Sequence, residues 1–131
     1  MRGVKKIRVL LVDDERSVLQ GLQMRLALEA DIGVVGQVED GMAVEKAASE
    51  LDPDVIVMDY GLPGQNGLEA IAALEASGLD CSVVMLSIHD CPALRRAARE
   101  AGAAAFVAKH EPSESLVAAI RAAARHEEDA L

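Results

Sequence analysis

Near the N-terminus lies the run Ile7-Arg8-Val9-Leu10-Leu11-Val12-Asp13-Asp14, a short apolar segment that ends in two carboxylates. Its nearly continuous, β-branched composition is typical of a strand that is covered on both faces of a parallel sheet. A second apolar run, residues 55–58, ends in the same way at Asp59. Because the carboxyl ends of parallel strands meet at one edge of the sheet, we expect these three carboxylates to lie close together.

Strand and helix patterns alternate along the rest of the chain. Short apolar runs predict strands, and apolar residues at helical spacing between turn-forming residues predict helices. The predicted strands cover residues 7–12, 32–38, 55–58, 83–86 and 103–108. The predicted helices cover residues 15–30, 42–51, 68–76, 92–101 and 113–125, with Asp14 and Ser113 as caps of the first and the last.

This alternation predicts an α/β fold, because right-handed crossovers place parallel strands in one sheet with helices on both faces. Five strands with five helices favour a doubly wound sheet of flavodoxin-like order 2-1-3-4-5. In that order the topological switch point lies between the first and third strands, where Asp13, Asp14 and Asp59 emerge. Residues 1–125 are expected to form one domain, and residues 126–131 are expected to be a tail or linker stub.

The composition excludes several classes of protein. Apolar residues make up 51% of the 131 residues, which is enough for a folded core. The formal charge of −9 repels phosphate backbones, so we expect no direct nucleic acid contact by this domain. No apolar run approaches the about 20 residues that span a bilayer, so no membrane span is expected. The N-terminus is basic, but the apolar stretch behind it is short and stops at Asp13, so no secretion signal is expected. Cys81 and Cys91 match no metal-binding spacing and are interpreted as reduced thiols of a cytoplasmic protein.

Two further polar groups are expected at the same sheet edge. Ser87 follows the fourth predicted strand, and Lys109 follows the fifth. Carboxylates such as Asp13, Asp14 and Asp59 are the hard oxygen ligands that Mg²⁺ takes. We expect Asp14 to bind Mg²⁺ directly and Asp13 to act through water, with a backbone carbonyl from the loop after Asp59 completing the set.

The same residues favour phosphoryl transfer. The carboxylate of Asp59 is the predicted nucleophile, because an aspartate can attack phosphorus and form an acyl phosphate. Lys109 would neutralise charge on the transferred group, and Ser87 would offer a hydroxyl to one of its oxygens. Alone, each of these residues has a simpler structural role at a strand end, a helix cap or the surface; together they indicate a functional site.

Five segments of the chain resemble the receiver domain of two-component response regulators, which has a CheY-like fold. The segments are Val9-Leu10-Leu11-Val12-Asp13-Asp14-Glu15, Asp52-Pro53-Asp54-Val55-Ile56-Val57-Met58-Asp59, Leu62-Pro63-Gly64-Gln65-Asn66-Gly67, Leu86-Ser87, and Ala101-Gly102-Ala103 through Phe106 to Lys109. Each segment is weak by itself, but the five occur in order and at the spacing of receivers.

The resemblance implies that Asp59 accepts a phosphoryl group from a sensor histidine kinase or a phosphotransfer protein. It implies Mg²⁺ held by Asp13, Asp14, Asp59 and the carbonyl of Gly61. It also implies that Ser87 and Phe106 form a switch, in which the hydroxyl moves toward the phosphoryl group and the ring turns inward. Such a domain is not a classical enzyme, although it promotes its own phosphorylation and dephosphorylation.

Details of the chain are similar to the NarL/FixJ-like subgroup: the segment 36–41, the segment 87–90, and a Lys109 that is not followed by proline. Members of that subgroup usually carry a C-terminal DNA-binding domain, which implies regulation of transcription by a part absent from this chain, or else output by protein binding. Homodimerisation on phosphorylation is a further implied outcome. The expected output surface is built from the fourth helix, fifth strand and fifth helix, with the first and fifth helices as a second candidate.

Three residues depart from the usual receiver pattern. Tyr60 stands where an aliphatic residue is usual, Gly61 lacks a side chain that often tunes hydrolysis, and Ile88 is larger than the common alanine. These departures concern access to the phosphoryl group and its lifetime. We expect the bare position at Gly61 to leave that group open to water.

Three other functions are compatible with a fold of this class. A haloacid-dehalogenase-like phosphatase would need an acid two residues after the nucleophile, where this chain has Gly61. A flavodoxin-like electron carrier would need aromatic residues to sandwich a flavin, and the chain has only Tyr60 and Phe106. The main alternative is a degenerate receiver that acts as a phosphorylation-independent protein-binding module, which usually lacks one of the functional residues present here.

Overall fold

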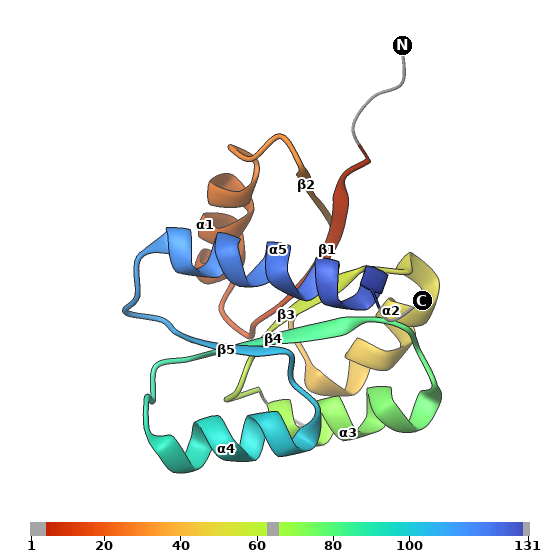
Figure 1. The fold of residues 1–131 in the computed structure, drawn as a ribbon, viewed down its shortest axis with the longest axis vertical. Coiled ribbons are helices and arrows are strands. Elements are labelled where there is room, and N and C mark those ends of the chain that lie inside the picture. The colour runs from red at the N-terminus through yellow and green to blue at the C-terminus, as the bar shows by residue number, and fades with distance from the viewer. Residues whose placement is uncertain (1–4, 63–65, 130–131) are drawn as a thin grey trace.

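The computed structural model describes residues 5–62 and 66–129, with side chains up to residue 125. One parallel sheet in the order β2-β1-β3-β4-β5 carries helices on both faces (Figure 1), so the predicted fold and strand order are confirmed. The strands are β1 (Ile7–Val12), β2 (Ile32–Val38), β3 (Val55–Asp59), β4 (Ser82–Ser87) and β5 (Ala105–Ala108). The helices are α1 (Arg16–Leu26), α2 (Val44–Leu51), α3 (Gly67–Ser77), α4 (Pro92–Ala101) and α5 (Ser113–Asp129), with a short 3₁₀ helix η1 (Gly41–Ala43) before α2.

Two hydrophobic clusters sandwich the sheet. Alternate residues of β1 point to opposite faces, so Val9 and Leu11 join the cluster beneath α1 and α5, whereas Leu10 and Val12 join the one beneath α2, α3 and α4. All four side chains are buried, as the continuous apolar run predicts for a central strand of a doubly covered sheet. The central strands are therefore a rigid base for the residues that follow them.

The start of α1 differs from the prediction that Asp14 caps it. The N-cap residue is Glu15, and its backbone N–H donates to the carboxylate of Asp13 at 3.0 Å. The buried Asp13 side chain thus reaches the helix start, whereas Asp14 is exposed and belongs to the acidic cluster described below.

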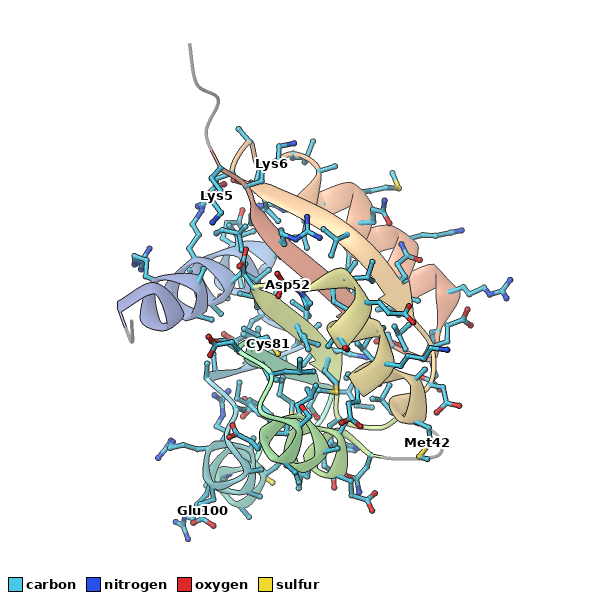
Figure 2. All side chains as sticks on the ribbon, turned by 90° about the vertical axis from the view of Figure 1, so that its right-hand side faces the viewer. Lys5, Lys6, Met42, Asp52, Cys81 and Glu100 are labelled. Atoms are coloured by element: carbon cyan, nitrogen blue, oxygen red, sulfur yellow. The ribbon has the colours of Figure 1, made fainter. Side chains whose placement is uncertain are left out.

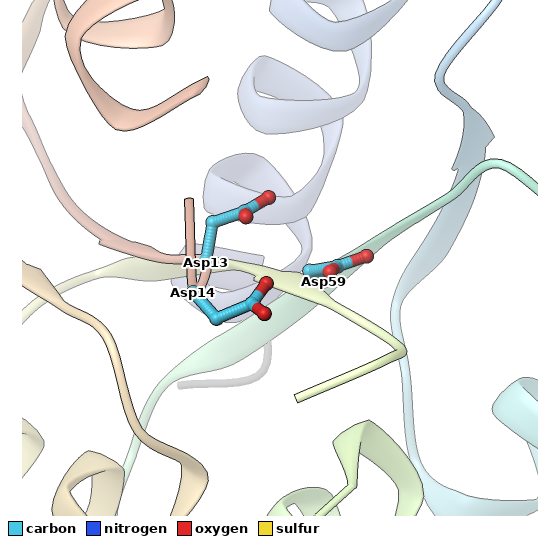
Figure 3. Close-up of side chains that lie close together, drawn as sticks. All are labelled: Asp13, Asp14 and Asp59. Atoms are coloured by element: carbon cyan, nitrogen blue, oxygen red, sulfur yellow. The ribbon is translucent and has the colours of Figure 1, made fainter. Parts of the chain in front are cut away.

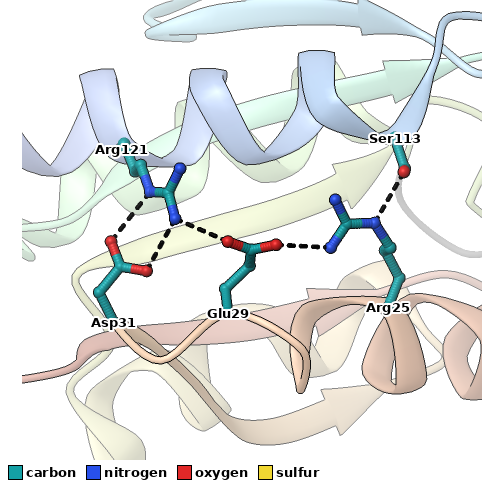
Figure 4. Close-up of polar contacts among 5 residues, drawn as sticks. All are labelled: Arg25, Glu29, Asp31, Ser113 and Arg121. Carbon is teal, nitrogen blue, oxygen red and sulfur yellow. Dashed lines mark hydrogen bonds and ion pairs between the residues drawn. The ribbon is translucent and has the colours of Figure 1, made fainter.

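The end of α1 also differs, since the helix stops at Leu26 and not at residue 30. Beyond it, Glu29 and Asp31 turn toward α5, where Arg121 donates to both at 2.8 to 3.0 Å (Figure 4). Arg25 joins Glu29 from the other side. The ion pairs of Arg121 tie the α1–β2 connection to α5.

Two boundaries in the second half were also misplaced. Strand β5 begins at Ala105 and not at residue 103, because Gly102 ends α4 with φ +117° and Ala103 still donates its N–H to Ala98. Helix α5 continues to Asp129, past the predicted end at residue 125. Ser113, the predicted cap, is the first residue of the helix, and its hydroxyl accepts a hydrogen bond from Arg25.

The remaining parts of the prediction concern loops and the tail. Residues 63–65 of the predicted loop and residues 130–131 of the predicted tail lie outside the described residues.

Lys6 and Asp52 lie at the end of the molecule where the strands begin, and Met42 lies at the opposite end (Figure 2). Across the described residues, no helix has both the length and the apolar content needed to cross a bilayer.

Candidate functional site

The candidate site lies at the carboxyl edge of the sheet, where backbone hydrogen bonds continue past the last strand residues. Asp13 donates its N–H to Val38 at 3.0 Å, Tyr60 donates to Leu86 at 3.0 Å, and Lys109 donates to the carbonyl of Ser87 at 2.8 Å. The residues predicted to be functional therefore either take part in the hydrogen bonding of the sheet or are next in sequence to residues that do. They do not lie on long loops.

Three carboxylates meet at this edge. Oxygen atoms of Asp13, Asp14 and Asp59 all lie within 4.8 Å of one another, and Figure 3 shows Asp14 and Asp59 approaching from neighbouring strand ends. Their burial differs: Asp13 is 1% exposed, Asp59 is half-buried, and Asp14 faces solvent. The predicted convergence of the three residues is confirmed.

Lys109 completes the cluster from the end of β5. Its ammonium donates to Asp13 Oδ2 at 3.1 Å and lies 3.3 Å from Asp59 Oδ1. The two carboxylates are far from Lys109 in sequence, and only the parallel topology brings them together. One ammonium among three carboxylates leaves an excess of negative charge at the site.

The electrostatics of Asp59 reflect that excess. Partial burial raises the pKa of Asp59, and the charge of Asp13 raises it further. Lys109 and the backbone N–H of Gly61 oppose these effects without cancelling them. Burial lowers the pKa of Lys109, but the attraction of Asp59 and Asp13 outweighs it, so that pKa lies above its ordinary value. The ionised Asp59 is thus under-compensated and suited to a bound cation.

The chemistry of the donor set fits Mg²⁺. All three groups are carboxylates, which are hard oxygen ligands, and Mg²⁺ uses one or two such groups while it keeps several waters. Asp14 is exposed and open to such an ion, whereas Asp13 already accepts hydrogen bonds from Lys109 and Glu15. The described residues near the cluster offer neither the sulfur nor the imidazole ligands that would indicate zinc.

Ser87 ends β4 and Phe106 lies within β5, the two strands that follow β3 in the sheet. Ser87 is 1% exposed, and its hydroxyl accepts a hydrogen bond from the backbone N–H of His89 at 3.0 Å. Phe106 is partly buried against the cluster beneath α3 and α4, and the guanidinium of Arg95 lies 4.7 Å from its ring centroid. Ile88, which follows Ser87, is 70% exposed.

The comparisons with known proteins agree with this geometry. Residues 9–121 match the response regulator receiver domain. This chain belongs to that family. It is 34% identical over 116 residues to the transcriptional regulatory protein NarL of Mycobacterium tuberculosis, covering 88% of this chain and 54% of NarL. It is 39% identical over 115 residues to the response regulator GacA of Pseudomonas aeruginosa, with the same coverage of the two chains.

A solved structure is similar over almost the whole receiver domain. The signal receiver domain of NarL from Mycobacterium tuberculosis superimposes with a TM-score of 0.88 at 33% identity, covering 92% of this chain and 98% of that one. The chain thus spans about half the length of the curated relatives it matches. Its relatives are transcriptional regulators of the NarL type, so the predicted subgroup is confirmed. A receiver is a signalling domain and not a classical enzyme.

Sequence reasoning missed one close approach in this receiver domain. A Cβ atom at Gly67 would lie 3.0 Å from Tyr60 Cα, 3.2 Å from the Asp59 carbonyl oxygen and 3.0 Å from Met85 Cε. The N–H of Gly67 also donates to the carbonyl of Tyr60 at 2.9 Å. Glycine therefore lets the start of α3 pack against the backbone of Asp59.

A capping box at the same place could have been found in the sequence. The Asn66 side chain accepts from the N–H of Glu69 at 2.9 Å, and the Glu69 carboxylate accepts from the N–H of Asn66 at 3.1 Å. The spacing of these two residue types is the signal. Together with Gly67 they fix the start of α3 beside the site.

Proposed function

We propose that this receiver domain accepts a phosphoryl group on Asp59 from a phosphohistidine of a sensor kinase or phosphotransfer protein. An oxygen of the Asp59 carboxylate attacks the phosphorus and forms a P–O bond. The P–N bond to the donor imidazole breaks, and the released ring nitrogen takes up a proton. The observation that carries this proposal is the contact of Asp59 with both an ammonium and two further carboxylates at the end of a buried strand.

The roles of the neighbouring groups follow from their places. Asp13, Asp14, Asp59 and the carbonyl of Gly61 would hold Mg²⁺, which when bound supplies positive charge against the phosphoryl oxygens. Lys109 would neutralise a phosphoryl oxygen from the β5 side, since its ammonium already lies 3.3 Å from Asp59.

Ser87 and Phe106 would carry the switch. The hydroxyl of Ser87 would leave the N–H of His89 and donate to a phosphoryl oxygen, and the ring of Phe106 would turn inward behind it. The altered surface would lie on α4, β5 and α5, with α1 and α5 as a second candidate for homodimerisation. Because the relatives are transcriptional regulators about twice as long, the output would be regulation of transcription through a DNA-binding part.

Labelling with acetyl phosphate and Mg²⁺ tests the phosphoacceptor. The intact mass should rise by one phosphoryl group in the wild type and not in Asp59→Asn, and removal of Mg²⁺ by a chelator should abolish the gain. Asp80→Asn is a matched control, because Asp80 is an exposed aspartate at the other end of the sheet, just before β4, and should label normally. No label on the wild type would instead favour a receiver that only binds protein.

A further inference from the structure

Arg95 of α4 contacts three groups that lie on separate segments. Its Nε donates to Asp90 Oδ1 at 2.7 Å, and a terminal nitrogen lies 3.7 Å from Glu111 Oε2. Its guanidinium carbon lies over the Phe106 ring, 4.7 Å from the centroid. One side chain thus joins the β4–α4 loop, strand β5 and the β5–α5 loop.

Each of these groups is connected to the phosphoryl-transfer site. Asp90 follows His89, whose backbone N–H holds the hydroxyl of Ser87. Glu111 Oε2 accepts the backbone N–H of Ala108 at 2.7 Å, directly before Lys109. Phe106 is itself the aromatic residue of the expected switch. Arg95 therefore contacts the aromatic ring directly, and it contacts the segments next to the Ser87 hydroxyl and the Lys109 ammonium through Asp90 and Glu111.

The surroundings of the Phe106 ring leave it room to move. A hollow of about 190 Å³ lies between α4 and β5, which are neighbours in Figure 1. It is lined by Arg95, Arg99 and Phe106 together with small residues, Ala98 and the alanines at 103–105. The electrostatics agree with a formed ion pair, since the hydrogen bond from Arg95 lowers the pKa of Asp90.

We propose that Arg95 is a positioning residue that holds the switch in its resting arrangement, so that its contacts set how readily the receiver changes state. This inference rests on the proposed function, because it concerns the switch that phosphorylation of Asp59 would drive. A contact made in only one of two states favours that state, and its loss favours the other. Removal of Arg95 should therefore populate the active arrangement before any phosphorylation.

The measurable consequence is a higher affinity for a phosphoryl analogue. In Arg95→Gln, binding of beryllofluoride in the presence of Mg²⁺ should tighten by about three- to tenfold, the range expected from one cation–π contact and the shorter of two partly exposed ion pairs, the one with Asp90. Arg95→Lys keeps the charge but loses the planar fork, so it should fall between the wild type and Arg95→Gln. Tyr60 follows Asp59 and is the only tyrosine in a chain without tryptophan, so its fluorescence reports the titration.

A second readout separates a switch role from a merely structural one. Phe106 is the only phenylalanine of the chain, so selective labelling gives a single ring system in the NMR spectrum. In Arg95→Gln without beryllofluoride, this signal should move toward the position that it has in the beryllofluoride-bound wild type. Arg96→Gln is the matched control, because Arg96 is the next residue on α4, is exposed, and contacts none of Asp90, Phe106 and Glu111 among the described contacts.

The outcomes distinguish this inference from the proposed function. If the wild type binds beryllofluoride and Arg95→Gln binds with equal or lower affinity, with an unmoved Phe106 signal, Arg95 does not hold the resting state. If the wild type does not bind beryllofluoride at all, the proposed function fails and this inference fails with it. Tighter binding in Arg95→Gln with wild-type affinity in Arg96→Gln supports the proposal.

Discussion

Adding one methyl group at Gly67 should harm the protein, whereas the same change at Gly21 should stabilise it. At Gly67 the new Cβ would meet Tyr60 Cα at 3.0 Å and the Asp59 carbonyl at 3.2 Å, and these backbone atoms must shift by a few tenths of an ångström. At Gly21, within α1, nothing lies within 4 Å of the new atom. The pair isolates the effect of crowding from that of the substitution itself.

The magnitudes follow from these contacts. Overpacking costs about 1–3 kcal/mol. The better helix propensity of alanine returns about 0.5–1 kcal/mol at Gly21 in the interior of α1, and less at Gly67, which is the first residue of α3. Gly67→Ala should therefore lose about 1–2 kcal/mol of unfolding free energy, and Gly21→Ala should gain about 0.5–1 kcal/mol. A gap of about 2 kcal/mol corresponds to about 1 M in the urea midpoint at a slope of about 2 kcal/mol/M.

Urea unfolding followed by circular dichroism measures the change in unfolding free energy. Labelling by acetyl phosphate measures a second effect, on the rate of phosphorylation. Because the Asp59 carbonyl is one of the crowded atoms, Gly67→Ala should also label about three- to tenfold more slowly, since small displacements of a reacting group cost rate. Gly21→Ala should label like the wild type. A Gly67→Ala protein whose urea midpoint equals or exceeds that of the wild type would refute the argument that α3 needs glycine to approach Asp59.

Three other predictions follow from the ion pairs. Lys109→Met should slow acetyl phosphate labelling of Asp59 by at least about tenfold, because no ammonium then faces the transferred group; unchanged labelling kinetics would count against its role. Asp59→Asn should unfold at a higher temperature than the wild type without Mg²⁺ and respond less to added Mg²⁺, because burial and Asp13 disfavour the charge that it removes; a lower melting temperature would contradict this. Arg25 and Arg121 lower the pKa of Glu29, and Arg121 lowers the pKa of Asp31. The stabilising effect of these ion pairs is therefore present above the unfolded-state pKa values near 4 and is lost as pH falls through the folded-state values. Arg121→Gln should therefore lower the urea midpoint at pH 7 but hardly at pH 3, and an equal loss at both pH values would show that the pairs are not responsible.

Much of the site could be predicted because buried parallel strands leave a simple trace in a sequence. Apolar runs that stop abruptly at Asp13, Asp59 and Lys109 mark both the strands and the edge at which they end. Once the strand order follows from right-handed crossovers, the convergence of these residues follows as well. The strand order thus predicts the contact between Asp13 and Lys109, which are far apart in sequence, although no local sequence pattern does.

The parts that could not be predicted depend on side-chain contacts between helices and loops. The early end of α1 accompanies ion pairs of Glu29 and Asp31 with Arg121, ninety or more residues away, and a local propensity cannot see such a partner. The three contacts of Arg95 depend in the same way on how loops meet above β5. Asp14 was predicted to cap α1, but the N-cap residue is Glu15, and the N–H of Glu15 donates to the buried Asp13. A sequence pattern does not distinguish which of two neighbouring aspartates makes such a contact.

The residues of the site lie on two kinds of strand, the central strands β1 and β3 and the edge strand β5, and this division suits the proposed switch. Asp13 follows β1 and Asp59 is the last residue of β3; the core residues of these two central strands are almost fully buried, and each strand pairs on both sides. Phe106 and Lys109 belong to β5 or follow it, and β5 is a four-residue edge strand that pairs with β4 alone. Edge elements with fewer buried contacts open at lower free energy than central ones. We therefore expect that a charge added at Asp59 would leave the carboxylates on the central strands in place. The residues that move should be those at β4 and β5, and the change should reach the surface at α4.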